Sequence, residues 1–270
     1  MEGRMNMSEF WKNINTYYKR YGLHATIVRI MDKLTGQSRV DYMTWYQKTK
    51  PTKQVLKIQR ETTFPYMPEI LVIVLENKSG FHRLADSLKN QTYSRWKLCK
   101  IRELNDVVEI LKEAKEEYVL ITQPEDELSV DAFFQCVKSL NADRTIEAIY
   151  SDDDIIKNET EYEEPAMKPD LNLDMFRSCN YIHNFLLVKK KLCQKLFEEC
   201  LESWNGQIDW KYDFIFRCIE EKRSIHHIAK VLYHRNVEHV QVCDEQERKA
   251  IDMHLKRRQS IEGFIVSDIR

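Results

Sequence analysis

The chain has 270 residues, of which 43% are hydrophobic and 31% charged, the composition of an ordinary globular protein with one large or two small domains. Its formal net charge of −1 provides no overall positive field, so we expect no nucleic-acid partner. The 7 cysteines are odd in number and none are spaced as CxxC. This pattern disfavours a disulfide framework or a zinc site and indicates a reducing compartment.

Residues 8–34 combine apolar side chains at helical spacing with lysines and arginines, which predicts a basic helical segment. It could lie on an anionic membrane surface, or it could form a helical hairpin packed on the main domain. Residues 40–61 predict two short helices separated at Pro51, and we expect residues 1–67 to be a helical N-terminal extension. No apolar run approaches the ~20 residues of a membrane span, and the N-terminal residues MEGRMNMSEF contain no apolar signal core. We therefore expect a cytoplasmic protein whose membrane contact is at most peripheral.

Apolar runs and amphipathic segments alternate from residue 68 onward. EILVIVL, YVLIT and IEAIYS are rich in β-branched residues, as is typical of buried parallel strands, and helical spacing lies between them. This order predicts an α/β fold with a mostly parallel sheet flanked by helices over residues 68–243. Residues 244–270 predict a C-terminal helix and tail. Ligands bind beyond the carboxyl ends of such strands, so acids after Thr122 and Tyr150 should lie on the functional rim.

Several blocks resemble the motifs of one known family, in order and at similar spacing. They are NQTYSRWKLC at 90–99, IYSDDDII at 149–156, then KPD and NYI, and finally YDFIFR and VLYHR. Together they resemble glycosyltransferase family 2, and the N-terminal region resembles that of bacterial cell-surface polysaccharide transferases. The resemblance implies a GT-A-like fold, a nucleotide-sugar donor and a divalent metal, Mg²⁺ or Mn²⁺.

The resemblance places the metal-binding acids of the family in LITQPEDEL, where Gln123 and Glu125 stand for its two aspartates. A diphosphate leaving group carries dense negative charge that a metal neutralises, and hard cations take carboxylate ligands. Glu125 and Asp126 are therefore the expected donor and metal ligands. His234 is a further candidate ligand, and the alternative is a strand-end side chain bonded to the backbone.

The transfer also requires a carboxylate base that accepts the proton of the acceptor hydroxyl. In the family this acid lies two residues before the aspartate of the YD block, where the present chain has Lys211. Asp209 and Asp213 are therefore the candidate bases. The alternative for Asp209 is a helix N-cap.

Further expected contacts lie on the acceptor side of the same rim. Asp152 and Asp154 either contact the acceptor or the metal, or they anchor the KPD segment at 168–170 through hydrogen bonds. The remaining candidates by resemblance are Asn180, Tyr181 and His183 on the acceptor side and Asn77 as a cofactor contact.

Two departures from the family pattern concern the donor nucleotide. The acid pair that holds the nucleobase and ribose reads Arg102-Glu103, and too few residues separate Cys99 from Tyr118 for one further strand-helix unit. The nucleotide pocket should therefore be reduced.

Two functions stay open. The first is an enzyme that moves a sugar from a nucleotide donor to a cell-surface polysaccharide or lipid-linked precursor. The alternative is a catalytically inactive glycosyltransferase-like protein that binds a glycan or a partner glycosyltransferase.

Overall fold

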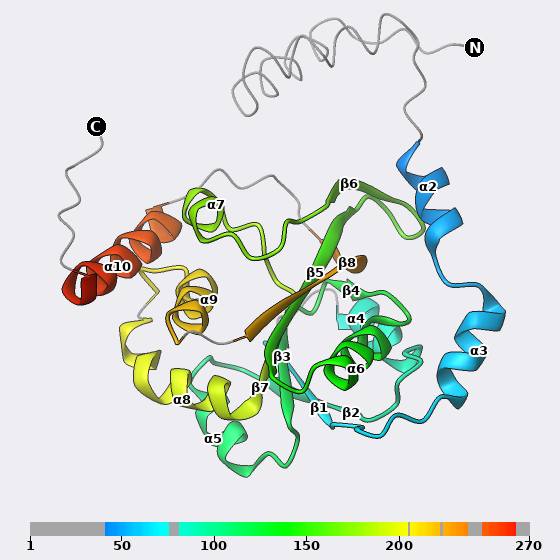
Figure 1. The fold of residues 1–270 in the computed structure, drawn as a ribbon, viewed down its shortest axis with the longest axis horizontal. Helices are drawn as coiled ribbons and strands as arrows, with labels where there is room; N and C mark the ends of the chain where they lie inside the picture. The colour runs from blue at the N-terminus through cyan, green and yellow to red at the C-terminus, as the bar shows by residue number, and fades with distance from the viewer. Residues whose placement is uncertain (1–40, 76–80, 205, 222–223, 237–244, 263–270) are drawn as a thin grey trace, which may run out of the picture. The chain divides into compact units, whose positions relative to one another are not determined.

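The structure, a computed structural model, describes residues 41–75, 81–204, 206–221, 224–236 and 245–262 (Figure 1). The chain divides into two compact units, Met1–Thr49 and Lys50–Arg270. The described part of the first unit contains helix α2 (Tyr42–Thr49). Residues 8–34 and Asn77, for which we predict a membrane contact and a cofactor contact, lie outside the described residues. The domain boundary after residue 67 stays a prediction.

The second unit contains the sheet and the remaining helices among the described residues. Its helices are α3 (Lys53–Glu61), α4 (Phe81–Lys89), α5 (Asp106–Glu113), α6 (Ala132–Ala142), α7 (Leu173–Ser178), α8 (Lys190–Cys200), the 3-10 turn η1 (Leu201–Ser203), α9 (Trp210–Glu220) and α10 (Glu245–Glu262). Its strands are β1 (Ile70–Leu75), β2 (Trp96–Ile101), β3 (Tyr118–Thr122), β4 (Glu127–Leu128), β5 (Ile146–Ile156), β6 (Tyr162–Ala166), β7 (Leu186–Lys189) and β8 (Ser224–Arg235). Among the helices described, none has the length and apolar character needed to cross a membrane.

The strands form one sheet in the order β2-β1-β3-β7-β5-β8-β4, and β6 pairs with the second half of β5. β1 is parallel to β2 and β3, and β5 is parallel to β8. β7 is antiparallel to both β3 and β5, and β4 is antiparallel to β8. Strands β1, β2, β3, β5 and β8 therefore run in one direction. The prediction of an α/β fold with a mostly parallel sheet flanked by helices is confirmed (Figure 1).

Alternate residues of the central strands enter two hydrophobic cores, one on each face of the sheet. Leu71 and Ile73 of β1 belong to the core that also contains α5, α8 and α9. Ile70 and Val72 belong to the core that contains α4 and α6. A strand covered on both faces needs no polar alternation, which explains why ILVIVL is a continuous apolar run.

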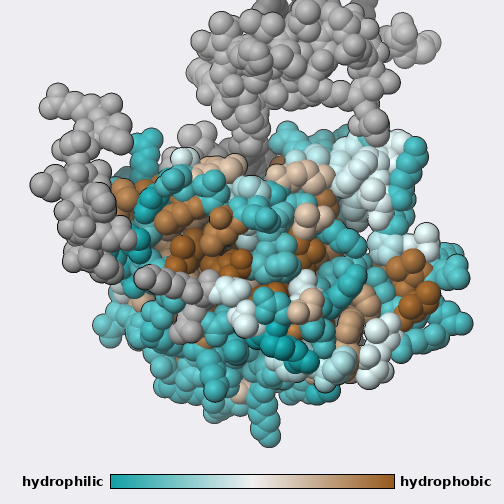
Figure 2. Space-filling view, viewed as in Figure 1, coloured by the Kyte–Doolittle hydropathy of each residue, from teal (hydrophilic) through white to brown (hydrophobic). Residues whose placement is uncertain are grey.

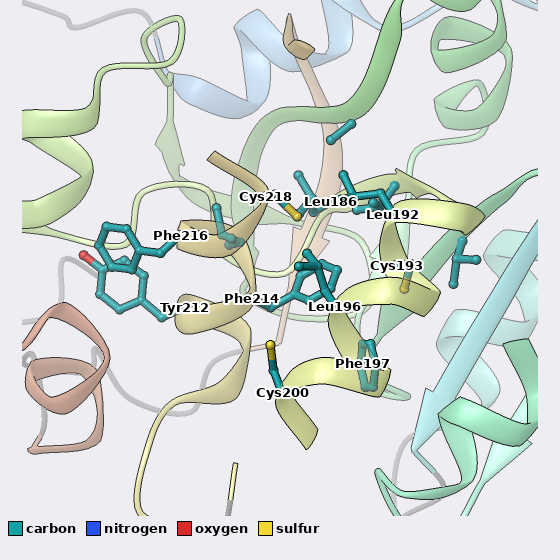
Figure 3. Packing of buried hydrophobic residues seen from close by; sticks show 14 of the residues in the cluster. Leu186, Leu192, Cys193, Leu196, Phe197, Cys200, Tyr212, Phe214, Phe216 and Cys218 are labelled. Carbon is teal, nitrogen blue, oxygen red and sulfur yellow. The ribbon is translucent and has the colours of Figure 1, made fainter. Parts of the chain in front are cut away.

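The helices α8 and α9 face each other across the first core, as Figure 3 shows, with Phe197 on α8 and Phe214 on α9. Cys193, Cys200 and Cys218 are free thiols buried in the same core. Burial raises the pKa of all three thiols, so they stay protonated and act as small apolar side chains.

The two helices predicted on either side of Pro51 are confirmed, and α3 packs within the second unit. Thr52 caps its start by accepting a hydrogen bond from Val55 N at 3.3 Å. Further along the helix, Gln59 is only 6% exposed and donates to Asp131 Oδ2 at 3.2 Å. The face of the protein shown in Figure 2 is mostly hydrophilic, with separate hydrophobic patches between the polar side chains.

The polar segment after β5, KNETEYEEPAMKPDLNLD at 157–174, is predicted to be a loop from its sequence, but the structure contains more regular structure there. β6 lies within this segment, and α7 begins at its end. Asn172 caps α7 by accepting a hydrogen bond from Met175 N at 2.9 Å, and Phe176 carries the helix into the core with no exposed surface. Six residues with one fully buried side chain are too few for a helical period to be recognised.

Candidate functional site

Asp126 lies just beyond β3, and its carboxylate is bonded to neighbouring protein groups. Its Oδ2 accepts hydrogen bonds from Tyr233 Oη at 2.6 Å and Asn184 Nδ2 at 3.1 Å. Its Oδ1 accepts one from the backbone N–H of Asn236 at 2.8 Å. The residue is 1% exposed, and burial raises the pKa of its carboxyl against the opposing effect of these donors. Asp126 therefore ties the end of β3 to β8 and to the segment before β7.

The other two predicted metal ligands do not complete a metal site with Asp126. His234 is buried with its Nδ1 2.6 Å from Asp154 Oδ1 and its ring stacked on Tyr162, whereas Glu125 is half-buried. Across the described ranges, no group of three or more His, Cys, Asp or Glu side chains is placed to hold a metal ion. A cation at Asp126 would have to displace the O–H and N–H donors that already surround the carboxylate. The residues that the structure describes do not fit the divalent metal that the resemblance implies.

The predicted strand end at Ser151 is wrong, because β5 continues to Ile156. Asp152 and Asp154 therefore lie within the strand, where they are 4% and 0% exposed. The second half of β5 pairs with both β6 and β8, whose residues supply the partners that acidic side chains need inside a sheet. These aspartates are enclosed and do not lie on an open rim.

Lys168 holds the KPD segment against β5, as the alternative reading of these aspartates predicts. Its Nζ donates to Asp153 Oδ2 at 2.6 Å, and its backbone N–H donates to Asp152 Oδ1 at 2.8 Å. Arg235 Nε donates to the other oxygen of Asp153 at 3.1 Å. Burial alone would raise the pKa of Asp153, but Lys168, His183 and Arg235 outweigh it and hold the pKa below its usual range.

His183 joins this cluster from a left-handed backbone conformation, with φ of 60°. Such a conformation costs a non-glycine residue about 1–3 kcal/mol, so the surrounding contacts must hold it. Its Nδ1 lies 2.8 Å from Asp153 Oδ2, and its backbone N–H donates to Asn180 Oδ1 at 3.1 Å. Burial lowers the pKa of His183 to about 4, despite the opposing effect of Asp153. The ring is therefore neutral at pH 7, with a proton on Nδ1 and an acceptor at Nε2.

Tyr181, predicted on the acceptor side, is 6% exposed and packs in the first core. Its hydroxyl accepts a hydrogen bond from Asn172 N at 2.9 Å, and its ring meets those of Tyr150 and Phe176 edge-on. Tyr181 thus braces the segment that carries Asn180 and His183. Its assignment as an acceptor contact stays a prediction.

Asp213, the second candidate base, is enclosed by donors on α9, α10 and the segment after η1. It accepts hydrogen bonds from Arg217 Nε at 2.7 Å, Trp204 Nε1 at 2.9 Å and Arg257 Nη2 at 2.8 Å. Burial would raise the pKa of Asp213, but the hydrogen bonds from Arg217 and Trp204 and the charge of Arg257 lower it. A carboxylate stabilised in this way is a weak proton acceptor.

Asp209, the first candidate base, is the N-cap of α9. Its Oδ1 accepts a hydrogen bond from Tyr212 N at 3.0 Å. Replacing it with alanine should lower the free energy of unfolding by about 1 kcal/mol, the usual value of a lost cap, as measured by urea denaturation. Asp209→Asn keeps an acceptor and should be nearly neutral. Equal stability of Asp209→Ala and the wild type would contradict the capping role.

A small pocket lies among β3, β7, α8 and α9. Its walls are aliphatic side chains from both strands together with Trp210 and Phe214. Its polar lining consists of His183, Asn184 and Lys211, and none of the described side chains that line it is acidic.

Lys211 brings a positive charge to the position where the family has its catalytic acid. Its Nζ donates to Asn184 Oδ1 at 3.0 Å, and the amide of Asn184 donates in turn to Asp126. Burial lowers the pKa of Lys211, while the charges of Asp126 and Asp209 raise it. A chain of hydrogen bonds therefore links the pocket to the carboxylate predicted to bind metal.

Asn184 was not predicted from the sequence. Its side chain nevertheless connects Lys211 at the pocket with Asp126 beyond β3. Its only sequence signal is its position next to the NYI block. The departure at Lys211 could be identified by counting residues, but its burial and its contact with Asn184 could not.

No family model matches the chain. It is 30% identical over 246 residues to the uncharacterized protein y4gI of Sinorhizobium fredii, with 75% of this chain and 26% of that protein covered. It is 25% identical over 181 residues to the O-antigen biosynthesis protein RfbC of Myxococcus xanthus, with 66% and 13% covered. The chain thus spans about a quarter or less of the length of these curated relatives.

Among solved structures, the chain is similar to S. aureus TarS in complex with UDP, with a TM-score of 0.47, 12% identity, and 72% of each chain covered. It is also similar to the mannosyltransferase PcManGT from Pyrobaculum calidifontis in complex with GDP-Man and Mn²⁺, with a TM-score of 0.42, 15% identity, and 67% and 62% of the two chains covered.

The motif blocks, the sheet order and the similarity to an O-antigen biosynthesis protein agree with one another. The chain resembles bacterial glycosyltransferases of the GT-A type. In this glycosyltransferase-like chain, the two residues directly after the NYI block and the helix that carries the YD block line one pocket beside β3.

Proposed function

We propose that the chain is a glycosyltransferase domain of the family 2 type. It transfers a sugar from a nucleotide-sugar donor to a cell-surface polysaccharide or its lipid-linked precursor. The observation that carries the proposal is the convergence of three motif-bearing segments on one pocket: β3, the residues before β7, and the start of α9. Similarity to an O-antigen biosynthesis protein supports the polysaccharide context.

The pocket offers suitable chemistry for a sugar. Trp210 supplies an aromatic face, and the amide of Asn184 and the neutral ring of His183 supply hydrogen-bonding groups. Of the two candidate bases, Asp209 adjoins the pocket through Trp210 and Lys211, whereas Asp213 is enclosed by arginines. We therefore propose Asp209 as the base. The described residues support no step through Glu125, Asp126 or His234 as metal ligands.

A second candidate is a catalytically inactive glycosyltransferase-like module that binds a glycan or a partner glycosyltransferase. Two observations favour it. Asp126 is saturated by donors, and Lys211 occupies the position of the expected acid. In either case we propose a cytoplasmic location, with residues 8–34 as a peripheral membrane contact.

UDP- and dTDP-sugars should raise the melting temperature of the chain. At a hundredfold excess over the dissociation constant, a ligand adds about 2.7 kcal/mol to the stability of the folded state. The titration is performed with Mg²⁺, with Mn²⁺ and with EDTA, and nucleotide release on addition of candidate acceptors is measured in parallel.

The outcomes separate the two candidates. No shift with any nucleotide-sugar would overturn the transferase proposal, and a shift without nucleotide release on any acceptor would favour the inactive module. A metal-dependent shift in melting temperature that is lost in Glu125→Ala, but retained in the exposed control Glu159→Ala, would support the predicted metal site.

A further inference from the structure

Lys211 lies where a cation could act on both the pocket and the predicted metal site. Asn184 separates its Nζ from the carboxylate of Asp126, with one hydrogen bond of 3.0 Å and one of 3.1 Å. The charge of Lys211 acts to lower the pKa of Asp126, and the charge of Asp126 acts to raise the pKa of Lys211. A positive charge is therefore fixed near the carboxylate of Asp126, one of the predicted metal ligands.

The ammonium of Lys211 is held in place and retains donor capacity. An ammonium has three N–H donors, and within the described part of the chain the hydrogen bond to Asn184 uses one of them. Its Nζ also lies 5.8 Å from the ring centre of Trp210, which lines the same pocket. The lysine is thus oriented by an amide on one side and an aromatic ring on the other.

The charge of the pocket lining favours an anion. Lys211 contributes the cation, and none of the described lining side chains is acidic. Asp153 lies behind His183, but Lys168 and Arg235 neutralise it. Asp126 and Asp209 also act on Lys211, but neither carboxylate lines the pocket, and Asp126 is turned to its own donors from Tyr233, Asn184 and Asn236.

We infer that Lys211 takes the place of a divalent metal, so that the pocket binds a phosphate or diphosphate group through the lysine ammonium without a divalent cation. The inference rests on the proposed function for the ligand, which is the diphosphate part of a nucleotide-sugar. His183 also lines the pocket. Its Nδ1 is held by Asp153, so its Nε2 offers an acceptor for a ligand hydroxyl. The site thereby combines a fixed cation with one hydroxyl-binding group.

The test measures pyrophosphate binding to the full chain by calorimetry, in EDTA and in Mg²⁺. We expect binding in EDTA that Lys211→Met weakens at least about tenfold, as for a lost charge-assisted hydrogen bond. Lys211→Arg should restore most of the affinity. Lys191→Met, the same change at an exposed lysine on α8, should have no effect. Binding that requires Mg²⁺, or that is unchanged in Lys211→Met, would overturn the inference.

A second measurement on the wild-type chain covers the case in which Lys211→Met does not fold. Pyrophosphate in EDTA should protect Lys211, but not Lys191, from acetylation as followed by mass spectrometry. Equal labelling with and without pyrophosphate would also overturn the inference. Pyrophosphate binding without binding of any nucleotide-sugar would contradict the proposed function alone, whereas nucleotide-sugar binding that depends on Mg²⁺ would contradict the inference alone.

Discussion

Replacing Asp213 with asparagine is expected to lower the free energy of unfolding by about 3–5 kcal/mol, the cost of removing one partner from a buried ion pair. Asp213 has no exposed surface and accepts hydrogen bonds from Arg217, Arg257 and Trp204. Its loss would leave two guanidinium groups beside a neutral amide in the interface between α9 and α10. Urea denaturation at pH 7 measures the change.

Asp174→Asn provides a matched control for Asp213→Asn. Asp174 also pairs with an arginine on its own helix, Arg177, but its side chain is 92% exposed. Exposed pairs of this kind contribute about 0–1 kcal/mol. A loss in Asp213→Asn no larger than that of the control would show that the buried cluster does not hold α10 to α9.

Asp153→Asn is also expected to lower the free energy of unfolding by about 3–5 kcal/mol, because Lys168 would lose its anionic partner in a fully buried position. The two side chains are 0% and 1% exposed, with 2.6 Å between Asp153 Oδ2 and Lys168 Nζ. The change also removes the partner that holds His183 in its left-handed conformation. The double variant Asp153→Asn/Lys168→Met, which removes both charges, should recover part of the loss.

The effect of Asp153→Asn should depend on pH. The folded state holds the pKa of Asp153 below its unfolded value of about 3.9, so its ionisation stabilises the protein above that value. This contribution is lost as the pH falls through the folded pKa. The stability difference between wild type and variant should therefore be constant from pH 5 to 7 and shrink below about pH 4. A difference that grows on acidification would contradict the assignment.

The sequence predicts the sheet well because each central strand is an uninterrupted apolar run that is buried on both faces. ILVIVL and YVLIT have this signal, and both form strands where predicted. The predicted end of the strand is wrong at Asp152 and Asp154, because acidic residues are typical of the end of a strand. In the structure the acids continue the strand, since their partners come from residues far along the chain.

The chemistry of the candidate site could be only partly predicted for a similar reason. The motif places Asp126 at a strand end, and that placement is correct. Its donors, however, come from Asn184 and Tyr233, which are 58 and 107 residues away in the sequence. No local pattern shows that these groups converge, so a carboxylate that reads as a metal ligand is found bonded to protein donors.

The sheet order also has a consequence for self-association. β2 ends the described sheet and pairs there with β1 alone. An edge strand presents unpaired backbone groups on which another chain can add. Lys97 and Lys100 are both exposed along this strand, and Lys97 pairs with Glu116 at 2.5 Å. Charges of this kind oppose edge-to-edge aggregation, so we expect these lysines to protect the edge that β2 presents.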